Sequence, residues 1–180
     1  MKIALILLVR NERQCLELLF DKIPKPGPSS GFDMLVAVDG GSDDGTAEYL
    51  QEHGIEVMEQ SKRGRGEAFQ QAFKQIEADA YLFFSPDGNE AISDLPCFRP
   101  LLESGADIVI ASRMMPESRN EEDDQLIRPR KWANKAFNQA ANLLFRRSGP
   151  FITDSINGYR AITKAVADRL QLDAFDYTIE

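Results

Sequence analysis

Five short apolar runs along the chain have the length and composition of buried parallel strands. Stretches with helical spacing separate the runs, so the predicted order is β-α-β-α-β-α-β-α-β. Alternating strands and helices build a mostly parallel sheet with helices on its faces. We therefore predict an α/β fold in a single domain over residues 1–180, with a mostly parallel central sheet flanked by helices. The five runs are residues 3–9, 34–38, 55–58, 81–84 and 108–111.

Two of the intervening stretches, and a third stretch after the last strand, carry the apolar stripe of an amphipathic helix, with apolar residues recurring at helical spacing. One such stripe is what a helix needs in order to cover a sheet, so we expect core packing to account for the aromatic residues within it. The stripes are Leu16, Leu19, Phe20 and Ile23; Phe69, Ala72, Phe73 and Ile76; and Ala133, Phe137, Ala140, Ala141 and Leu144.

Residues 116–128, between the last strand and the last helix, are too polar to pack against a core. They include Glu117, Glu121 and Glu122, and Asp123 and Asp124 follow directly. We predict a mobile acidic loop.

Composition narrows the class of protein. The formal net charge of −8 argues against a nucleic-acid binder, whose affinity rests on clustered Lys and Arg. No apolar run approaches the roughly 20 residues that span a bilayer, so any membrane contact is expected to be peripheral. The two cysteines, Cys15 and Cys97, have neither metal-ligand spacing nor the density of a disulfide scaffold. We expect a cytoplasmic protein, with possible contact at the cytoplasmic membrane face.

Four polar loops directly follow four of the predicted strands. In an open α/β sheet, ligands bind outside the carboxyl ends of the strands, where loops converge and helix N-termini point at the ligand. Four such loops together predict a binding site. They are Asn11-Glu12, residues 39–46, residues 85–89 and Ser112-Arg113.

The first two loops offer groups for a nucleoside. Asp39 can accept hydrogen bonds from a base or a ribose, and the glycines that follow, Gly40 and Gly41, let the backbone approach a ligand closely. An ordinary Gly-rich turn explains this loop equally well. Glu12, together with Asn11, has a similar alternative, because an acidic residue often stabilises the first turn of a helix.

A basic Gly-rich segment joins the third strand to the next helix. Gly64, Arg65 and Gly66 lie where a diphosphate would meet the helix N-terminus. The segment matches neither a Walker A loop nor a dinucleotide fingerprint, and a solvated basic turn is the alternative.

The loop after the aromatic fourth strand offers ligands for a divalent cation. Asp87 and Asn89 can share Mg²⁺ or Mn²⁺ with substrate phosphates, since Mg²⁺ commonly takes only one or two protein carboxylates. A simple Pro-Asp-Gly turn is the alternative.

Taken in order, these motifs resemble those of family 2 glycosyltransferases of the GT-A fold, a Rossmann-like fold, and particularly the polyprenol-phosphate mannosyl- and glucosyltransferases. The resemblance covers nearly the whole chain. Arg10-Asn11-Glu12 is similar to the family's Tyr-Asn-Glu, residues 38–46 to Val-Asp-Asp-Gly-Ser-Thr-Asp-Gly-Thr, and residues 64–68 to Gly-Lys-Gly-x-Ala. Residues 106–113 are similar to the family's strand that ends in Gly-Ser-Arg, and residues 153–161 to Thr-Asp-x-x-Ser-Gly-Phe-Arg-Ala.

The resemblance implies a hexosyltransferase that uses a UDP- or GDP-hexose, Mg²⁺ or Mn²⁺, and a polyprenyl phosphate or glycan acceptor of the cell envelope. Glu12 and Asp39 would hold the nucleoside, Arg65 would approach the diphosphate, and Asp87 with Asn89 would serve the metal. The sequence departs from the family pattern where Ser85 replaces the first Asp of Asp-x-Asp, Arg10 replaces Tyr and Gly40 replaces Asp. Relatives usually continue past Glu180.

A phosphate acceptor fits the lack of a histidine base near the motifs, because His53 is the only histidine. A phosphate monoester has a second pKa of about 6, so it attacks without losing a proton to the enzyme. We predict in-line displacement with inversion at the anomeric carbon. The candidates to hold the acceptor phosphate are Arg113, Arg128, Arg130 and Arg160. The alternative for these arginines, strongest for Arg128, is surface solvation or ion pairing with the acidic loop.

Two other functions remain open. A saccharide hydroxyl acceptor would need a base, either Asp154 or a residue beyond this sequence. A nucleotide-binding pseudoenzyme would fit Ser85 and the short chain. A nucleotidyltransferase is disfavoured because no Gly-rich pyrophosphorylase loop follows the first strand.

Overall fold

The computed structural model describes residues 1–115, 129–146 and 149–170, with the backbone alone at positions 129 and 130. The predicted acidic loop and Arg128 lie outside these residues. The chain divides into two compact units. The first is Met1–Val109 with Gly158–Ile179, and the second is Ile110–Asn157; each is described by itself.

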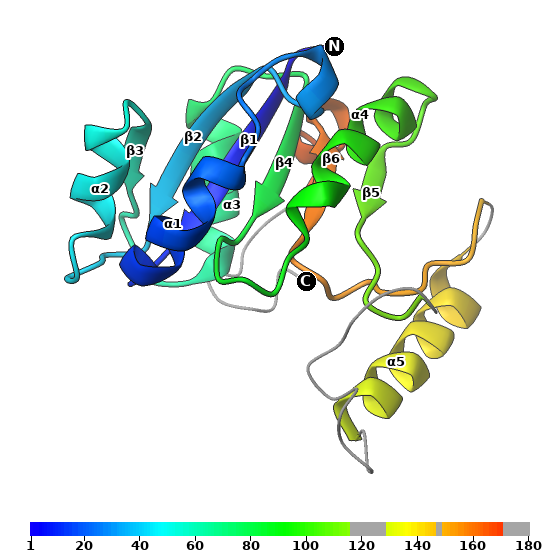
Figure 1. Cartoon of the computed structure of the whole chain (residues 1–180). Helices are drawn as coiled ribbons and strands as arrows, with labels where there is room; N and C mark the ends of the chain where they lie inside the picture. Colours follow the sequence, from blue (N-terminus) through cyan, green and yellow to red (C-terminus); the bar gives the residue numbers. More distant parts are fainter. Residues whose placement is uncertain (116–128, 147–148, 171–180) are drawn as a thin grey trace. The chain divides into compact units, whose positions relative to one another are not determined.

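Within the described residues the sheet has six strands, in the order β3-β2-β1-β4-β6-β5 (Figure 1). The predicted α/β fold with a mostly parallel sheet is confirmed, because β1 pairs in parallel with β2 and β4, and β2 with β3. The sixth strand was not predicted, and it runs antiparallel to β4. The strands are β1 Ile3–Val9, β2 Met34–Asp39, β3 Glu56–Glu59, β4 Ala80–Phe84, β5 Ile108–Ile110 and β6 Arg160–Thr163.

Helices connect the strands on both faces of the sheet. In the first unit, α3 lies on one face, and α1 and α4 lie on the other (Figure 1). The helices are α1 Arg13–Leu19, α2 Thr46–Glu52, α3 Arg65–Gln75, α4 Leu95–Glu103, α5 Pro129–Phe145 and α6 Lys164–Ala167, with 3-10 turns at Phe20–Lys22, Pro28–Ser30 and Ile92–Asp94.

The core of the first unit follows the alternation of side chains along the strands. Ile6 of β1 and Phe83 of β4 face α3, where Phe69 stacks on Phe83 with ring centroids 3.8 Å apart. On the opposite face, Tyr159 contacts Phe84 of β4 and Phe98 of α4. The predicted stripe of α3 therefore packs on the sheet as expected.

Strand register brings the polar loops to one edge of the sheet. Val9 pairs with Asp39, so the loops after β1 and β2 begin side by side. Because β6 is antiparallel to β4, with Arg160 opposite Phe83, the start of β6 lies at the same edge as the end of β4. The carboxyl ends of β1, β2, β3 and β4 and the amino end of β6 thus frame this edge in the first unit.

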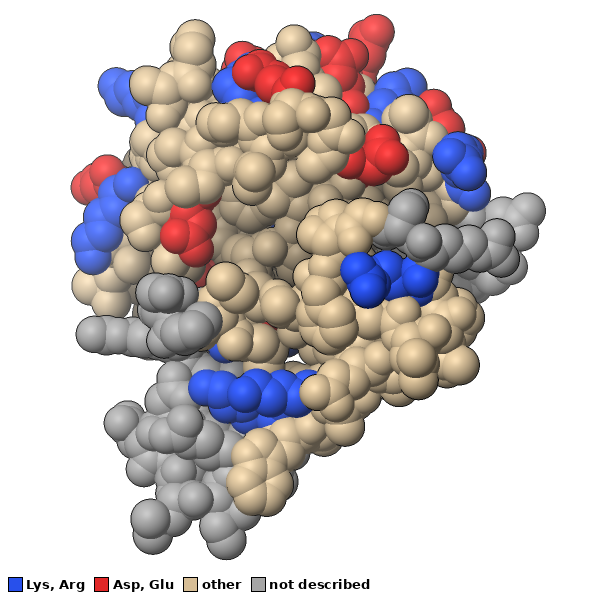
Figure 2. Space-filling view, turned by 90° about the vertical axis from the view of Figure 1, so that its right-hand side faces the viewer, with Lys and Arg blue, Asp and Glu red and all other residues tan. Residues whose placement is uncertain are grey.

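The described helices and surface also bear on membranes and nucleic acids. Among the described residues, we find no helix with the length and hydrophobicity needed to cross a bilayer. On the face drawn in Figure 2, the Lys and Arg side chains of the described residues form small separate groups, not the continuous basic band typical of nucleic-acid binders.

Candidate active site

A groove of about 390 Å³ opens in the first unit at the carboxyl ends of β1, β2 and β4. Its volume is within the range of roughly 300–1,000 Å³ typical of small-molecule sites. Four predicted site residues line it together, and the three residues that depart from the family pattern, Arg10, Gly40 and Ser85, join them. The four are Glu12, Gly64, Arg65 and Asp87.

The other predicted donor and metal residues do not line the groove. They are Asn11, Asp39, Gly41, Gly66 and Asn89. A second depression, of about 530 Å³, lies at the opposite edge of the sheet beside Met1, Asp79 and Lys164, and none of the predicted site residues lines it.

Hydrogen bonds join the loop after β1 to the loop after β2. The Asn11 backbone N–H donates to Ser42 Oγ at 2.9 Å, and Asn11 Oδ1 accepts from the Asp43 N–H at 2.9 Å. The Glu12 N–H donates to Thr46 Oγ1 at 2.9 Å. Asn11 adopts φ +57°, a left-handed conformation that Asn tolerates better than most residues. Asn11 therefore fixes the two loops against each other, a contact between distant segments that the sequence did not reveal.

Asp39 shapes its own turn. Its side chain is buried, and Asp39 Oδ2 accepts from the backbone N–H groups of Gly41, at 3.2 Å, and Ser42, at 3.0 Å. The Ser42 hydroxyl donates to Asp39 Oδ1. Gly41, at φ +83°, has the positive φ that favours glycine. The predicted contact between Asp39 and a nucleoside stays a prediction.

Glu12 lies in a crowded acidic environment. Burial raises the pKa of its carboxyl above the usual 4.5, and the nearby carboxylates of Asp87 and Asp44 raise it further. A hydrogen bond from the Cys15 thiol acts in the opposite direction. The groove thus concentrates negative charge at Glu12 and Asp87, and a bound cation or a ligand that donates hydrogen bonds would relieve this repulsion.

Replacing Glu12 with Gln is expected to stabilise the ligand-free protein at neutral pH. A carboxyl whose pKa is raised on folding adds stability only below its unfolded pKa, and that stability is lost as pH rises through the folded value. Because Glu12 is partly exposed, we expect the free energy of unfolding at pH 7 to rise by only about 0.5 kcal/mol, with the difference vanishing near pH 4. Thermal melts of both proteins across this pH range measure the effect.

Glu48, which is exposed on α2 and does not line the groove, provides the control for this substitution. The Glu48→Gln variant should show no such gain at pH 7. An equal gain in both variants would mean that the effect comes from net charge and not from the groove.

Arg65 brings a cation and a helix N-terminus to the groove. The helix α3 starts at Arg65, directly after Gly64 at φ +128°. Arg65 Nη2 donates to Ser85 Oγ at 3.0 Å. Gly66 is buried in the first helical turn and does not face the groove. Helix N-termini and guanidinium groups both favour anions, so this corner of the groove suits a diphosphate.

Asp87 is the carboxylate available to a metal at the end of β4. It is exposed, and its Oδ1 accepts from the Asn89 N–H at 2.9 Å across a turn in which Gly88 adopts φ +86°. Within the described part of the chain, no group of three or more His, Cys, Asp or Glu is arranged to hold a metal. One carboxylate fits Mg²⁺ or Mn²⁺ only if substrate phosphates and water complete the coordination.

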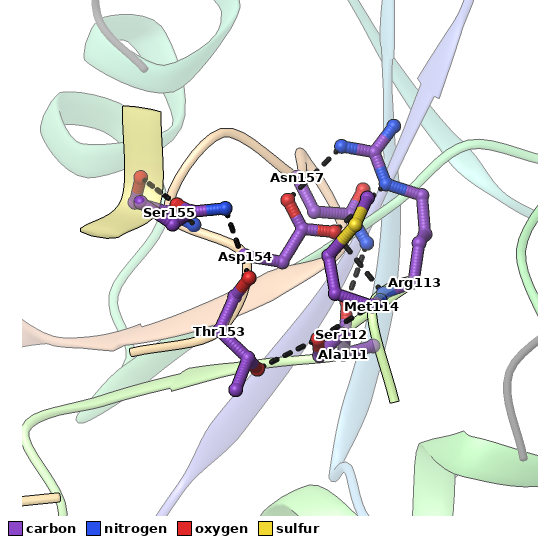
Figure 3. Close-up of polar contacts among 9 residues, drawn as sticks. Ala111, Ser112, Arg113, Met114, Thr153, Asp154, Ser155 and Asn157 are labelled. Carbon is purple, nitrogen blue, oxygen red and sulfur yellow. Dashed lines mark hydrogen bonds and ion pairs between the residues drawn. The ribbon is translucent and has the colours of Figure 1, made fainter. Parts of the chain in front are cut away.

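A second polar cluster belongs to the second unit and is drawn in Figure 3. Arg113 Nε donates to Asp154 Oδ2 at 2.9 Å, and Arg113 Nη2 donates to Asp154 Oδ1 at 3.1 Å. The Arg113 N–H adds a third bond to Oδ2 at 3.1 Å. The Asp154 side chain is fully buried, whereas the Arg113 side chain is 41% exposed. Asp154 is therefore suited to hold Arg113, and its burial does not suit proton abstraction from an acceptor.

Two asparagines of α5 hold the segment that contains Asp154. Asn138 Nδ2 donates to the Thr153 carbonyl at 2.9 Å, and Asn138 Oδ1 accepts from the Ser155 N–H at 2.8 Å. Asn142 Oδ1 accepts from the Ile152 N–H at 2.9 Å. These bonds satisfy backbone groups that regular secondary structure leaves unpaired.

The prediction that α5 buries its apolar stripe is wrong for the described residues. Asn138 and Asn142 are buried, whereas Phe137 is 53% exposed and Leu144 is 72% exposed. The physical reason is that the polar face of the helix is occupied by the 152–155 segment, whose backbone requires hydrogen-bonding partners.

The other two described candidates for the acceptor phosphate, Arg160 and Arg130, belong to different units. Arg160 begins β6 in the first unit and is 9% exposed. Arg130 is in the first turn of α5, in the second unit.

The chain resembles known proteins in both sequence and structure. The family model for Glycosyl transferase family 2 matches residues 5–163. The chain is 31% identical to Glycosyltransferase AglJ of Haloferax volcanii over 140 residues, which cover 74% of this chain and 42% of that protein. It is 26% identical to Dolichol-phosphate mannosyltransferase of Pyrococcus furiosus over 189 residues, which cover 99% of this chain and 51% of that protein.

A solved structure shares the fold. Glucosyl-3-phosphoglycerate synthase from Mycobacterium tuberculosis, in complex with Mn²⁺ and UDP-glucose, matches with a TM-score of 0.69 at 20% identity, over 98% of this chain and 60% of that chain. The chain spans about half the length of the curated relatives it matches.

Proposed function

Because the chain belongs to glycosyl transferase family 2, we propose that it transfers a hexose from a nucleotide sugar to polyprenyl phosphate. The observation that carries this proposal is the groove in the first unit, where Glu12, Arg65 and Asp87 line one cavity at the carboxyl edge of the sheet. The relative from Pyrococcus furiosus, a dolichol-phosphate mannosyltransferase, supports a lipid phosphate as the acceptor.

In this proposal the groove binds the nucleotide sugar. Glu12 accepts hydrogen bonds from the nucleoside, beside the backbone of Gly40, while Asp39 and Asn11 hold the surrounding loops. Arg65 and the N-terminus of α3 bind the diphosphate through charge-assisted hydrogen bonds. As the sugar leaves the nucleotide, negative charge grows on the diphosphate, so the same groups stabilise the transition state.

Asp87 would hold Mg²⁺ or Mn²⁺ together with the diphosphate, and Asn89 fixes the Asp87 turn through its backbone N–H. When bound, the ion supplies further positive charge to the leaving diphosphate. Since Asp87 is the one described carboxylate that we propose as a ligand of the ion, we expect the protein to bind the ion far better with nucleotide than without it.

We further propose a phosphate acceptor that needs no protein base. The Asp154 carboxylate, the base candidate for a saccharide acceptor, is buried and paired with Arg113. A phosphate oxygen already carries its charge near neutral pH. Arg113, Arg130 and Arg160 remain the candidates to bind the acceptor phosphate, and direct attack on the anomeric carbon gives inversion.

Exposed apolar side chains on the second unit favour peripheral contact with the membrane that holds such an acceptor. Trp132 is 67% exposed and Phe145 is 77% exposed, both on α5, and Phe151 is 51% exposed. Aromatic side chains at a protein surface commonly enter the lipid headgroup region.

One experiment tests donor, acceptor and membrane contact together. The protein is mixed with UDP- or GDP-hexoses, Mn²⁺ and vesicles that contain polyprenyl phosphate; the vesicles are floated, and their lipids are analysed by mass spectrometry and NMR. We expect the protein to float with the vesicles and one donor to yield a hexosyl phospholipid with inverted anomeric configuration. Transfer only to a soluble saccharide would support the hydroxyl acceptor, and nucleotide binding without transfer or donor hydrolysis would support a pseudoenzyme.

A further inference from the structure

The guanidinium group of Arg65 contacts residues from two other elements of the first unit. Arg65 Nη2 donates to Ser85 Oγ at 3.0 Å, just after β4. Ser85 is itself buried, and its N–H donates to Glu90 Oε2 at 2.7 Å. The guanidinium group also packs against Gly158, which lies just before β6. Arg65 is therefore placed by its surroundings and does not simply extend into solvent.

Gly158 leaves room for this guanidinium group. A Cβ atom at position 158 would lie 2.8 Å from both Arg65 Cζ and Arg65 Nη1, closer than real Cβ atoms approach other atoms. Gly158 is not among the glycines with positive φ, so its backbone does not require glycine. Glycine is required at position 158 because the Arg65 guanidinium group occupies the space of a side chain there.

Ser85 orients Arg65 without bringing a negative charge to it. A hydroxyl accepts a hydrogen bond from the guanidinium group and carries no charge of its own. A carboxylate at position 85 would instead form an ion pair with Arg65 and compete with an incoming phosphate for the same donors. The departure of Ser85 from the family's Asp-x-Asp pattern thus has a physical consequence in the groove.

We propose that Ser85 and Gly158 are positioning residues that hold Arg65 toward the diphosphate, so that the protein binds a nucleoside diphosphate without a divalent ion. This proposal rests on the function proposed above and specifies how the donor site is built. Arg65 would supply positive charge to the diphosphate in the absence of metal, and Asp87 would hold the ion that adds further charge.

Calorimetric titration of UDP and GDP, in EDTA and in Mn²⁺, tests the proposal. We expect the wild-type protein to bind one of them in EDTA, and Arg65→Gln to weaken that affinity roughly 10- to 100-fold, as for loss of a charged hydrogen-bonding group. Ser85→Ala should weaken it about 3- to 10-fold, the range for one ordinary hydrogen bond. Lys74→Gln, which removes the same charge from the exposed last turn of α3 and away from the groove, is the matched control and should change it less than about 3-fold.

A double-variant comparison separates positioning from general damage. Gly158→Ala should weaken nucleotide affinity in EDTA but cause no further loss in an Arg65→Gln background, because both changes act on one guanidinium group. Its melting temperature should fall only slightly, since the atoms it displaces are at the end of a flexible side chain. Ser85→Asp should lower affinity in EDTA and increase the gain from Mn²⁺.

Each outcome is decisive. If the wild-type protein binds nucleotide only with Mn²⁺, or if Ser85→Ala and Gly158→Ala bind as tightly in EDTA as wild type, the positioning role is wrong while the proposed function stands. If neither nucleotide binds under either condition, both proposals fail.

Discussion

Asp87→Ala is expected to reduce hexosyl transfer by roughly 100- to 1,000-fold, the effect of losing several kcal/mol of metal-assisted charge stabilisation. Asp87 lines the groove with Arg65, and it is the exposed carboxylate at the end of β4. The increase in nucleotide affinity on adding Mn²⁺ should also disappear. Affinity in EDTA should stay the same or rise, since the substitution removes a negative charge near the diphosphate.

Transfer rates and calorimetric titrations of UDP or GDP, with and without Mn²⁺, measure these effects. Asp21→Ala provides a control, because Asp21 is exposed in a 3-10 turn and carries the same charge away from the groove. Unchanged Mn²⁺ dependence in Asp87→Ala would remove this residue from the metal site.

Asp154→Ala is expected to destabilise the second unit by about 2–3 kcal/mol. The fully buried carboxylate accepts three hydrogen bonds from Arg113. Breaking a buried ion pair typically costs about 3–5 kcal/mol, and the partial exposure of Arg113 places this case at or below the lower end of that range. Hydrogen exchange of amides in α5 and in residues 152–157 measures the loss of protection.

Asp168→Ala is the matched control, since Asp168 pairs with Lys164 and both side chains are at least half exposed. That substitution should leave hydrogen exchange in α5 unchanged. Equal protection of α5 in Asp154→Ala and wild type would show that the Arg113–Asp154 pair does not hold the second unit together.

The centre of the sheet was predictable because β1 and β4 are apolar and buried on both faces. Residues 3–9 form a continuous apolar run, and the structure has β1 at the same bounds. The strand β6 was missed because it begins with a buried arginine, Arg160, and only Ala161 and Ile162 within it are apolar, so no apolar run marks it. A pattern of apolar residues carries no signal for a strand whose place is set by antiparallel pairing with β4.

The candidate site was predictable in position but not in its internal contacts. Loops after neighbouring parallel strands meet at one edge, and this rule brought Glu12, Arg65 and Asp87 to one groove. The contacts of Asn11 with the 39–46 loop, and of Ser85 with Arg65, join segments 20 or more residues apart. Spacing along the chain does not encode such pairs.

The prediction that α5 buries its apolar stripe failed for a related reason. Helical spacing of Phe137 and Leu144 indicates an apolar face but not what covers it. Asn138 and Asn142 are buried because the 152–155 segment needs hydrogen-bond donors and acceptors, and only the folded chain reveals that need.

A crystal structure of the protein with Mn²⁺ and the nucleoside diphosphate that it binds tests the donor groove most directly. We predict the diphosphate within hydrogen-bonding distance of Arg65, the nucleoside beside Glu12 and the ion on Asp87. A nucleotide bound outside this groove, for example in the depression beside Lys164 at the opposite edge of the sheet, would contradict the proposed donor site.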